Sequence, residues 1–194
     1  FLVDTKGFDS REEIAGLLAS LYGGMDSMEL KKIRDRTHRG LRERHKAGFS
    51  AGGKSYGYTT APIDPNDPDS KKKHIIDESE AKIVREIFSR YADGESPRAI
   101  CNDFNKRGIP SPGSSWKRTK RRCKGWVNTA LVGNAKTYTG ILRREMYIGQ
   151  LVWNRRKSKK EPGTSRRVYE IRPQSEWEVR LHPELRIVDD ALWE

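Results

Sequence analysis

One stretch of sequence constrains the fold more than any other: residues 10–47, SREEIAGLLASLYGGMDSMELKKIRDRTHRGLRERHKA, which contain no proline. Apolar residues recur there at helical spacing, namely Ile14, Leu17, Leu18, Leu21, Met25, Met28 and Ile33. Ser10 is a suitable N-cap, and Gly48 follows a basic last turn as a stop signal. We therefore predict one helix of roughly 55 Å, since each residue adds ~1.5 Å. Gly23 and Gly24 mark the point where it would kink, contact another helix closely or break.

The two halves of this predicted helix differ in character. Up to Leu30 it is apolar and mildly acidic, whereas residues 31–46 carry eight Lys or Arg against Asp35 and Glu43. The first half therefore needs a partner surface, and the second half needs an anion. One interpretation is a coiled-coil or bundle helix with a solvated basic end. The other is a helix that self-associates and contacts DNA through Arg36, Arg39, Arg42, Arg44 and Lys46.

The net charge of +12 is distributed unevenly along the chain. Residues 1–30 and 173–194 each carry two basic and six acidic groups, whereas residues 31–172 carry 35 basic and 15 acidic groups, net +20. A basic body between acidic ends predicts a polyanionic partner, with double-stranded DNA as the first choice. The sequence has no apolar run of about 18 residues that could span a membrane. Its basic residues also do not follow one apolar-backed helix, as a membrane-surface anchor would require.

The ends of the sequence and its cysteines bear on its context. The first residues, FLVDTKGFDS, lack the features of a signal peptide and do not begin with Met. A helix that starts after Asp189, just as the chain stops, adds to the expectation that this is a fragment of a longer protein. Cys101 and Cys123 form no CxxC motif and have no paired histidines at ligand spacing. We therefore expect reduced thiols in a cytoplasmic protein and no metal site.

Residues 48–57, GFSAGGKSYG, are rich in glycine and basic. We expect residues 48–55 to be a linker that is flexible unless bound. Small residues allow a backbone to enter the narrow minor groove of DNA, where lysine meets a negative potential. The candidate contacts are Gly52, Gly53, Lys54 and Ser55. A plain interdomain linker is the alternative.

Residues 56–194 are predicted to form one domain that is mainly α with small β-hairpins, an α+β fold. Residues 56–60 and 74–77 resemble the strands of a hairpin. A helix over 78–93 would bury Ala81, Ile83, Val84, Ile87, Phe88 and Tyr91. A second helix, capped by Ser96 and running to Lys106, would bury Ile100, Cys101 and Phe104. The pair is compatible with a helix-turn-helix-like core, although many bundles that do not bind DNA show the same pattern.

A basic loop follows over residues 110–125, flanked by Trp116 and Trp126. Its predicted DNA contacts are Lys117, Arg118, Lys120, Arg121, Arg122 and Lys124, and the alternative is a solvated charge run. Lys136, Arg143 and Arg144 are further candidates. The remaining predictions are a helical turn over 127–133, a short helix over 137–144, β-structure over 147–154, a basic turn region over 155–167, a strand over 168–172 that pairs back as a hairpin, a strand end at Ile187 and Val188, and a helix capped by Asp189.

These pieces, in this order, resemble a large serine recombinase of the integrase or transposon type. MELKKIRDRTHRGL (28–41) is similar to the long helix that closes the catalytic domain of that family. The Tyr-Gly-Tyr after the linker is similar to the start of its recombinase domain. Further similarities are AKIVREIF (81–88), ICNDFNKRGIP (100–110), the Ile141-Leu pair before Tyr147-Ile-Gly, and IVDD (187–190). Each motif alone is weak, but the ordered set covers nearly the whole chain.

The resemblance implies a domain organisation and a chemistry. Residues 1–47 would be the end of a catalytic domain with its linking helix, and residues 56–194 a DNA-binding recombinase domain that a zinc ribbon follows. The family cuts DNA at attachment or transposon-end sites with a serine of the preceding domain, through a 5′-phosphoserine intermediate, as dimers and tetramers, without metal or nucleotide cofactor. The protein would be bacterial or phage-encoded, and this fragment would be inactive alone.

The chain itself offers no catalytic residue. Ser10, Ser20 and Ser27 fit as cap and helix residues, and Leu30 stands where many relatives have Arg, which argues against a catalytic role for Glu29. A non-catalytic DNA-binding regulator and an RNA-binding module remain alternatives. The RNA module is less favoured, because the sequence lacks the glycine and aromatic motif of RNA-recognition domains.

Overall fold

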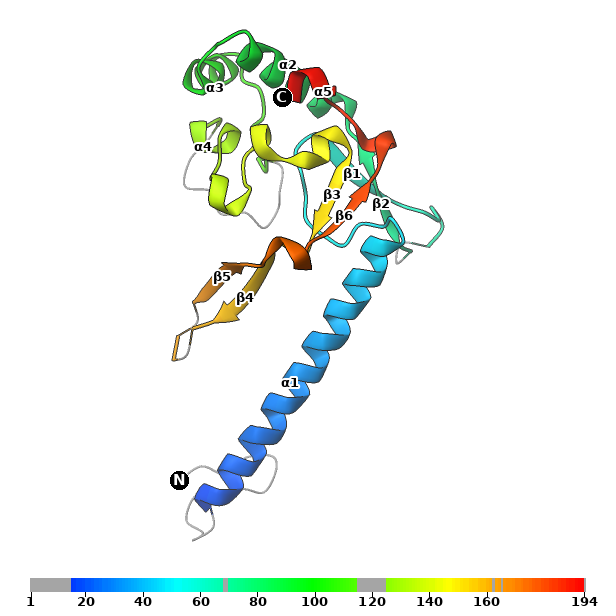
Figure 1. Ribbon diagram of the computed structural model, residues 1–194, viewed down its shortest axis with the longest axis vertical. Coiled ribbons are helices and arrows are strands. Elements are labelled where there is room, and N and C mark those ends of the chain that lie inside the picture. Colours follow the sequence, from blue (N-terminus) through cyan, green and yellow to red (C-terminus); the bar gives the residue numbers. More distant parts are fainter. Residues whose placement is uncertain (1–14, 68–69, 115–124, 162, 165, 194) are drawn as a thin grey trace. The chain divides into compact units, whose positions relative to one another are not determined.

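A computed structural model describes residues 15–67, 70–114, 125–161, 163–164 and 166–193 of the chain (Figure 1). The chain divides into two compact units, Phe1–Arg44 and His45–Glu194. Predicted features that lie outside the described residues include the N-cap at Ser10, Trp116 and the basic loop over 117–124 with Cys123.

The first unit is dominated by helix α1 (Ala15–Lys46), whose last two residues belong to the second unit. The helix continues without interruption through Gly23 and Gly24, so the break considered at this pair is absent. The Ser27 hydroxyl donates to the Gly24 carbonyl oxygen at 2.7 Å, which confirms Ser27 as a helix residue. Apolar side chains of α1 are exposed, namely Met25, Met28, Leu30 and Ile33, each more than half accessible to solvent.

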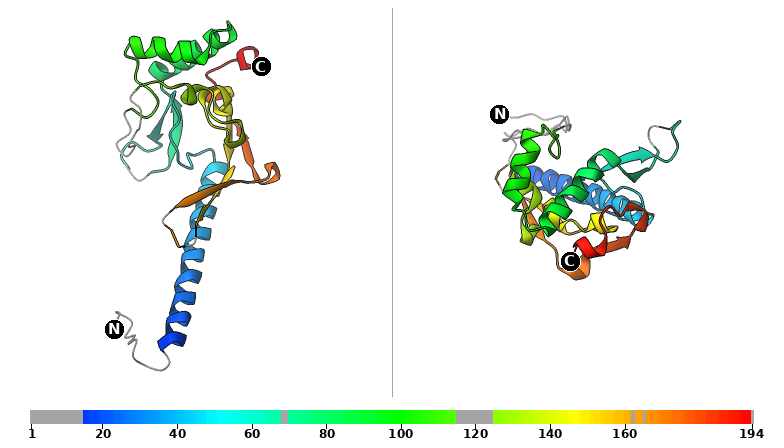
Figure 2. Two further views of the ribbon diagram at one scale, coloured as in Figure 1. Left: turned by 90° about the vertical axis from the view of Figure 1, so that its left-hand side faces the viewer. Right: turned by 90° about the horizontal axis from the view of Figure 1, so that it is seen from above.

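The second unit begins with a β-hairpin and two helices. Strands β1 (Tyr58–Pro62) and β2 (Lys72–Ile76) pair antiparallel, which confirms the predicted hairpin with both strands shifted slightly. Helices α2 (Glu78–Ala92) and α3 (Pro97–Lys106) lie side by side (Figure 2). Ser96 accepts from one backbone N–H group of α3, which confirms the predicted cap. Asp77, for which no cap was predicted, accepts from two backbone N–H groups of α2.

The core of the second unit joins these helices to the C-terminal part of the chain. Its buried members include Val84, Ile87, Phe104, Leu131, Ile141, Tyr147 and Val188. The Tyr58 hydroxyl donates to the carbonyl oxygens of Met146 and Leu185, both at 2.8 Å. Burial raises the pKa of this hydroxyl, so it remains a donor at neutral pH. Tyr91, predicted to be buried, is 49% exposed because it lies at the C-terminal end of α2, beyond the α2 residues that the core covers.

Short turns connect α3 to the last strands. Helix α4 (Asn128–Leu131) confirms the predicted helical turn, and 3-10 turns span Ala135–Thr137, Ile141–Arg143 and Glu145–Ile148. The predicted helix over 137–144 is therefore wrong. Tyr138 and Gly140 have φ values of 52° and 103°, which a right-handed helix does not allow. Ile141 is nevertheless buried, as its apolar character indicated.

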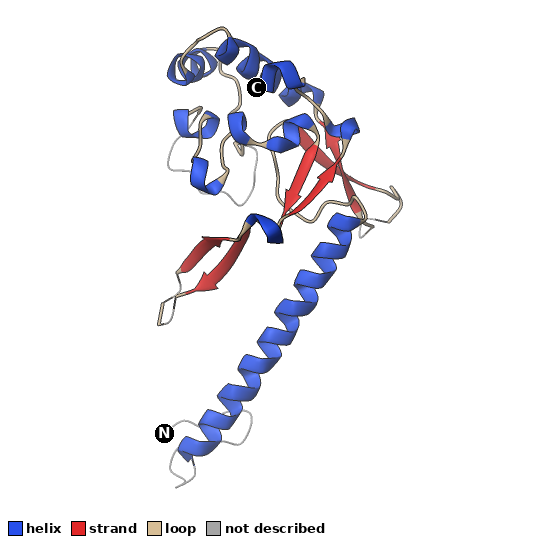
Figure 3. Cartoon of the chain, in the orientation of Figure 1, coloured by secondary structure: helices blue, strands red, loops and turns tan. Residues whose placement is uncertain are grey.

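Two further strand pairs complete the second unit (Figure 3). Strand β3 (Gln150–Trp153) pairs with β6 (Glu178–Leu181), and β4 (Arg156–Lys160) pairs with β5 (Arg167–Ile171), both antiparallel. The strand predicted over 168–172 is confirmed as β5, but it pairs with β4 and not with the β-structure predicted over 147–154. The basic turn region expected over 155–167 is wrong, because most of its first half is β4.

The chain ends in turns and a short helix. The 3-10 turns Gln174–Glu176 and Pro183–Leu185 flank β6. Ile187 and Val188 do not form a strand end. Instead, their backbone N–H groups both donate to the carbonyl oxygen of Tyr147, at 2.9 and 3.0 Å. Helix α5 (Asp190–Trp193) begins after Asp189, as predicted. The fold thus mixes helices with antiparallel strands, and the helix-turn-helix-like core stays a prediction.

Candidate nucleic-acid interface

The last turn of α1 and the first residues of the predicted linker are held by contacts within the second unit. His45, which is 4% exposed, stacks on Trp153, and its Nε2 lies 3.1 Å from the Glu178 carbonyl oxygen. Farther along, the Ser50 N–H donates to the Lys72 carbonyl oxygen at 2.8 Å, at the start of β2. The Phe49 ring lies beneath the ammonium groups of lysines from the β1–β2 connection and from β2. The path of the chain is therefore defined as far as Ser50.

The next residues are open to solvent. Gly52, Gly53 and Lys54 are exposed, and the two glycines have φ values of 102° and 86°. A Cβ added at either glycine would meet no described atom within 4 Å. The space there would admit a side chain, but the backbone conformation favours glycine. This combination suits close approach of a ligand to the backbone.

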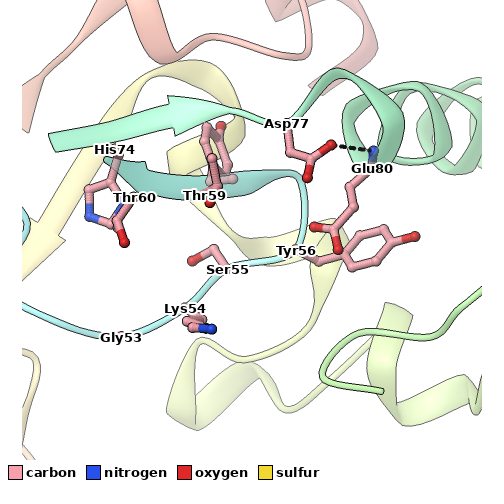
Figure 4. Close-up of a pocket in the computed structure, with 10 residues that line it drawn as sticks. Gly53, Lys54, Ser55, Tyr56, Thr59, Thr60, His74, Asp77 and Glu80 are labelled. Atoms are coloured by element: carbon pink, nitrogen blue, oxygen red, sulfur yellow. Dashed lines mark hydrogen bonds between the residues drawn. The ribbon is translucent and has the colours of Figure 1, made fainter. Parts of the chain in front are cut away.

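Beside this exposed segment lies a polar hollow of about 270 Å³ (Figure 4). Its lining includes Lys54 and Ser55 from the linker, His74 from β2, and the carboxylates Asp77 and Glu80. Glu80 accepts from the Gly57 N–H at 2.7 Å, and burial raises the pKa of its carboxyl group. Because both acidic groups face the same space as Lys54, the hollow does not form a purely cationic phosphate pocket.

The structure brings together one pair of predicted DNA-binding residues. An Arg144 nitrogen donates to the Ser55 hydroxyl oxygen at 2.5 Å, across 89 positions of sequence. Arg143 donates through Nε to the Val132 carbonyl oxygen at 3.1 Å, and Lys136 is exposed nearby in sequence. The remaining described candidates are exposed on α1, namely Arg36, Arg39, Arg42, Arg44 and Lys46. Lys117, Arg118, Lys120, Arg121, Arg122 and Lys124 lie outside the described residues.

Sequence reasoning missed the β4–β5 hairpin as a candidate surface. Residues 156–171 contain six basic and two acidic side chains. All five residues of β5 are exposed, and so are the first four of β4. The alternation of polar and apolar residues in RVYEI was a usable signal for a strand, but the facing segment RKSKK contains no apolar residue.

A cluster of interlocking side chains closes the base of this hairpin. The Arg155 guanidinium lies 4.8 Å from the ring centroids of both Tyr138 and Trp177, and these rings meet edge to face. Arg155 also forms an ion pair with Glu145. The Arg172 N–H donates to the Arg155 carbonyl oxygen at 2.8 Å, and the Trp177 indole donates to the Arg172 carbonyl oxygen at 2.9 Å. We call these five residues the hairpin clamp.

A comparison with models of protein families gives a match within the second unit. The model described as Recombinase matches residues 78–194, more than half of the chain. The chain belongs to the Recombinase family. No curated protein and no solved structure matches it.

Within this recombinase domain, part of the positive charge is neutralised internally. Arg90 of α2 pairs with Glu95 at 2.6 Å and with Asp103 at 2.7 Å, and Arg107 pairs with Glu86 at 2.5 Å. Hydrogen bonds from Arg90 lower the pKa of the Glu95 and Asp103 carboxyl groups, which remain ionised at neutral pH. These two arginines stabilise the contact between α2 and α3 and are poor candidates for phosphate contacts.

In the described part of this recombinase, the His, Cys, Asp and Glu side chains form no group of three or more that could hold a metal ion. Cys101 is buried in the core as a free thiol. Among the described helices, none has the length and apolar character needed to cross a membrane.

Proposed function

We propose that this chain is the DNA-binding portion of a serine-type site-specific recombinase. It would recognise duplex DNA at attachment sites or transposon ends. The single observation that carries the proposal is the match of the Recombinase family model to residues 78–194. Family membership indicates a role in site-specific recombination, and the net charge of +20 over residues 31–172 supports a DNA partner.

The proposed contacts fall on three segments. The exposed arginines of α1 would bind phosphates, Gly52 to Lys54 would approach the minor groove, and the loop over 117–124 would add sequence-independent affinity. The Ser27 hydroxyl donates to a carbonyl oxygen of its own helix, as expected of a helix residue. We propose that strand cleavage, through a 5′-phosphoserine intermediate, uses a serine of another domain. The exposed apolar side chains of α1 would pair with a second copy.

The test is binding of residues 1–194 to duplex DNA from the ends of the parent element, with a shuffled duplex of equal length as control. A specific recombinase module should prefer its own site by roughly 10³-fold or more. Equal affinity for both duplexes would contradict site recognition.

A second measurement separates binding from catalysis. Incubation with supercoiled DNA carrying the site should give neither nicks nor a covalent protein–DNA adduct. An adduct on denaturing gels would contradict the assignment of the nucleophile to another domain.

A further inference from the structure

The two faces of the β4–β5 hairpin carry different chemistry. In an antiparallel pair, residues opposite each other project to the same side. The register pairs Arg156 with Ile171 and Ser158 with Tyr169, so these four side chains share one face, and Arg167 belongs to it by alternation along β5. Their grouping is supported by the Arg156 guanidinium, which lies 5.9 Å from the Tyr169 ring centroid. We call this set the arginine face.

The opposite face holds Lys157, Lys159, Val168 and Glu170. Here Lys159 forms an ion pair with Glu170 at 2.7 Å, so part of the charge is neutralised. On the arginine face, by contrast, Arg156 and Arg167 form no ion pair with any residue that the structure describes. The two faces differ in available positive charge although they belong to the same short ribbon.

The arginine face also leaves apolar surface open to solvent. Tyr169 is 61% exposed and Ile171 is 39% exposed. The combination of exposed apolar side chains and guanidinium groups without ion-pair partners matches the chemistry of a DNA groove. There, arginine binds phosphates or guanine edges, and apolar groups contact thymine methyls or sugars.

The dimensions of the hairpin fit one groove better than the other. Five residues per strand give a ribbon about 17 Å long with strands about 4.8 Å apart. The major groove of B-DNA is about 12 Å wide and admits a two-stranded ribbon, whereas the minor groove is about 6 Å wide. Side chains on both faces make the ribbon too thick for the minor groove.

We propose that the β4–β5 hairpin is a second DNA-binding element of this chain, which lays its arginine face into the major groove. The proposal rests on the proposed function only in requiring that the protein binds duplex DNA. The hairpin clamp gives the ribbon a defined exit, because the backbone at both strand ends, Arg155 and Arg172, is held by hydrogen bonds and ring contacts. An ordered base lowers the entropy lost when the ribbon binds.

The test compares two double variants of residues 1–194 on a mixed-sequence 30-base-pair duplex, by fluorescence anisotropy over a salt series. Arg156→Ala with Arg167→Ala removes the charges of the arginine face, and Lys157→Ala with Lys159→Ala removes the same nominal charge from the opposite face. All four side chains are exposed, so both variants should fold as the parent does, which circular dichroism checks.

We expect the arginine-face variant to bind about tenfold to a hundredfold more weakly, with its salt slope reduced by about two. The lysine variant should stay within about threefold of the parent. Methyl green, which occupies the major groove, should compete with the parent protein more strongly than it competes with the arginine-face variant.

Three results would overturn the proposal. Equal loss in both variants would mean that the hairpin acts as an undirected charge, and no loss in either would mean that it faces solvent. Loss in the arginine-face variant with unchanged methyl green competition would place the contact outside the major groove. If the parent protein does not bind duplex DNA at 50 mM salt, the proposed function itself fails. This result is distinct from the three above, in which the parent protein binds DNA but the hairpin does not act as proposed.

Discussion

Replacing Arg155 with alanine should destabilise the second unit, whereas replacing its neighbour Arg156 should not. The Arg155 side chain is 15% exposed and lies between two aromatic rings, while Arg156 is exposed. The two positions are adjacent and carry the same residue type. The pair therefore separates the effect of the hairpin clamp from the effect of charge.

The magnitude follows from the contacts that are lost. Each partly buried cation–π contact contributes about 0.5–1 kcal/mol, and Arg155 makes two. Arg155 also pairs with Glu145, whose side chain is 22% exposed. Removing Arg155 leaves the Glu145 carboxylate without this partner, at a cost of about 1.5–3 kcal/mol. The Arg155 Nε is buried without a partner among the described residues, which reduces the net stabilisation that Arg155 provides. We expect a net loss of about 2–4 kcal/mol for Arg155→Ala.

The assay is urea unfolding of residues 1–194, followed by far-ultraviolet circular dichroism and by tryptophan fluorescence, because Trp177 belongs to the hairpin clamp. Arg155→Lys should recover little, since an ammonium group lacks the planar stacking surface of a guanidinium. Arg156→Ala should change the free energy of unfolding by less than about 0.5 kcal/mol. Equal effects of the two alanine substitutions would refute the reasoning, as would an Arg155→Ala protein as stable as the parent.

Three further perturbations have defined outcomes. Burial lowers the pKa of His45 and His74. The free energy of unfolding should therefore be constant above pH 7.5 and fall as the pH drops below about 6.5, by up to ~1.4 kcal/mol per pH unit for each histidine. A free energy of unfolding that does not change between pH 7 and 5 would contradict this. Gly133→Ala should lower the free energy of unfolding by more than about 3 kcal/mol, because its Cβ would lie 1.7 Å from a backbone carbonyl oxygen. Gly94→Ala, also at positive φ but in open space, should lower it by about 1 kcal/mol, and thermal unfolding measures both. Asparagine tolerates positive φ, so Gly53→Asn should leave the free energy of unfolding within about 0.5 kcal/mol of the parent but weaken DNA binding. Unchanged affinity for DNA would show that this segment only connects the two parts of the chain.

Local signals allowed much of the fold to be predicted from sequence. The Ser96 cap and the apolar spacing of α2 and α3 act within a few residues, and the structure has both helices where these signals place them. The continuity of α1 through Gly23 and Gly24 also follows from local helix propensity, because two glycines cost less than the rest of a long helix contributes.

Features that depend on distant partners were not predictable in the same way. Strand β4 has no apolar alternation and exists because β5 pairs with it. The segment 137–144 was predicted to be helical, but Tyr138 is held at φ 52°, where its ring meets Trp177 and Arg155 from later in the chain.

The same limit applies to the candidate interface. Composition indicated which residues are basic, but not which of them the fold neutralises. Arg90 and Arg107 are engaged by carboxylates of α2, α3 and the turn between them. Arg156 and Arg167 are left available on the two strands of a hairpin, of which β4 was not predicted from the sequence. The bond between Ser55 and Arg144 joins segments whose proximity only the tertiary structure defines.

The central claim is that the basic body of this recombinase binds the phosphates of duplex DNA. The most direct test is the affinity of residues 1–194 for a duplex between 50 and 200 mM salt. If about six to ten phosphates are neutralised, the association constant should fall by roughly 10³- to 10⁵-fold over this range. An association constant that stays nearly constant across the series would contradict the claim, because the basic groups would then face solvent rather than DNA.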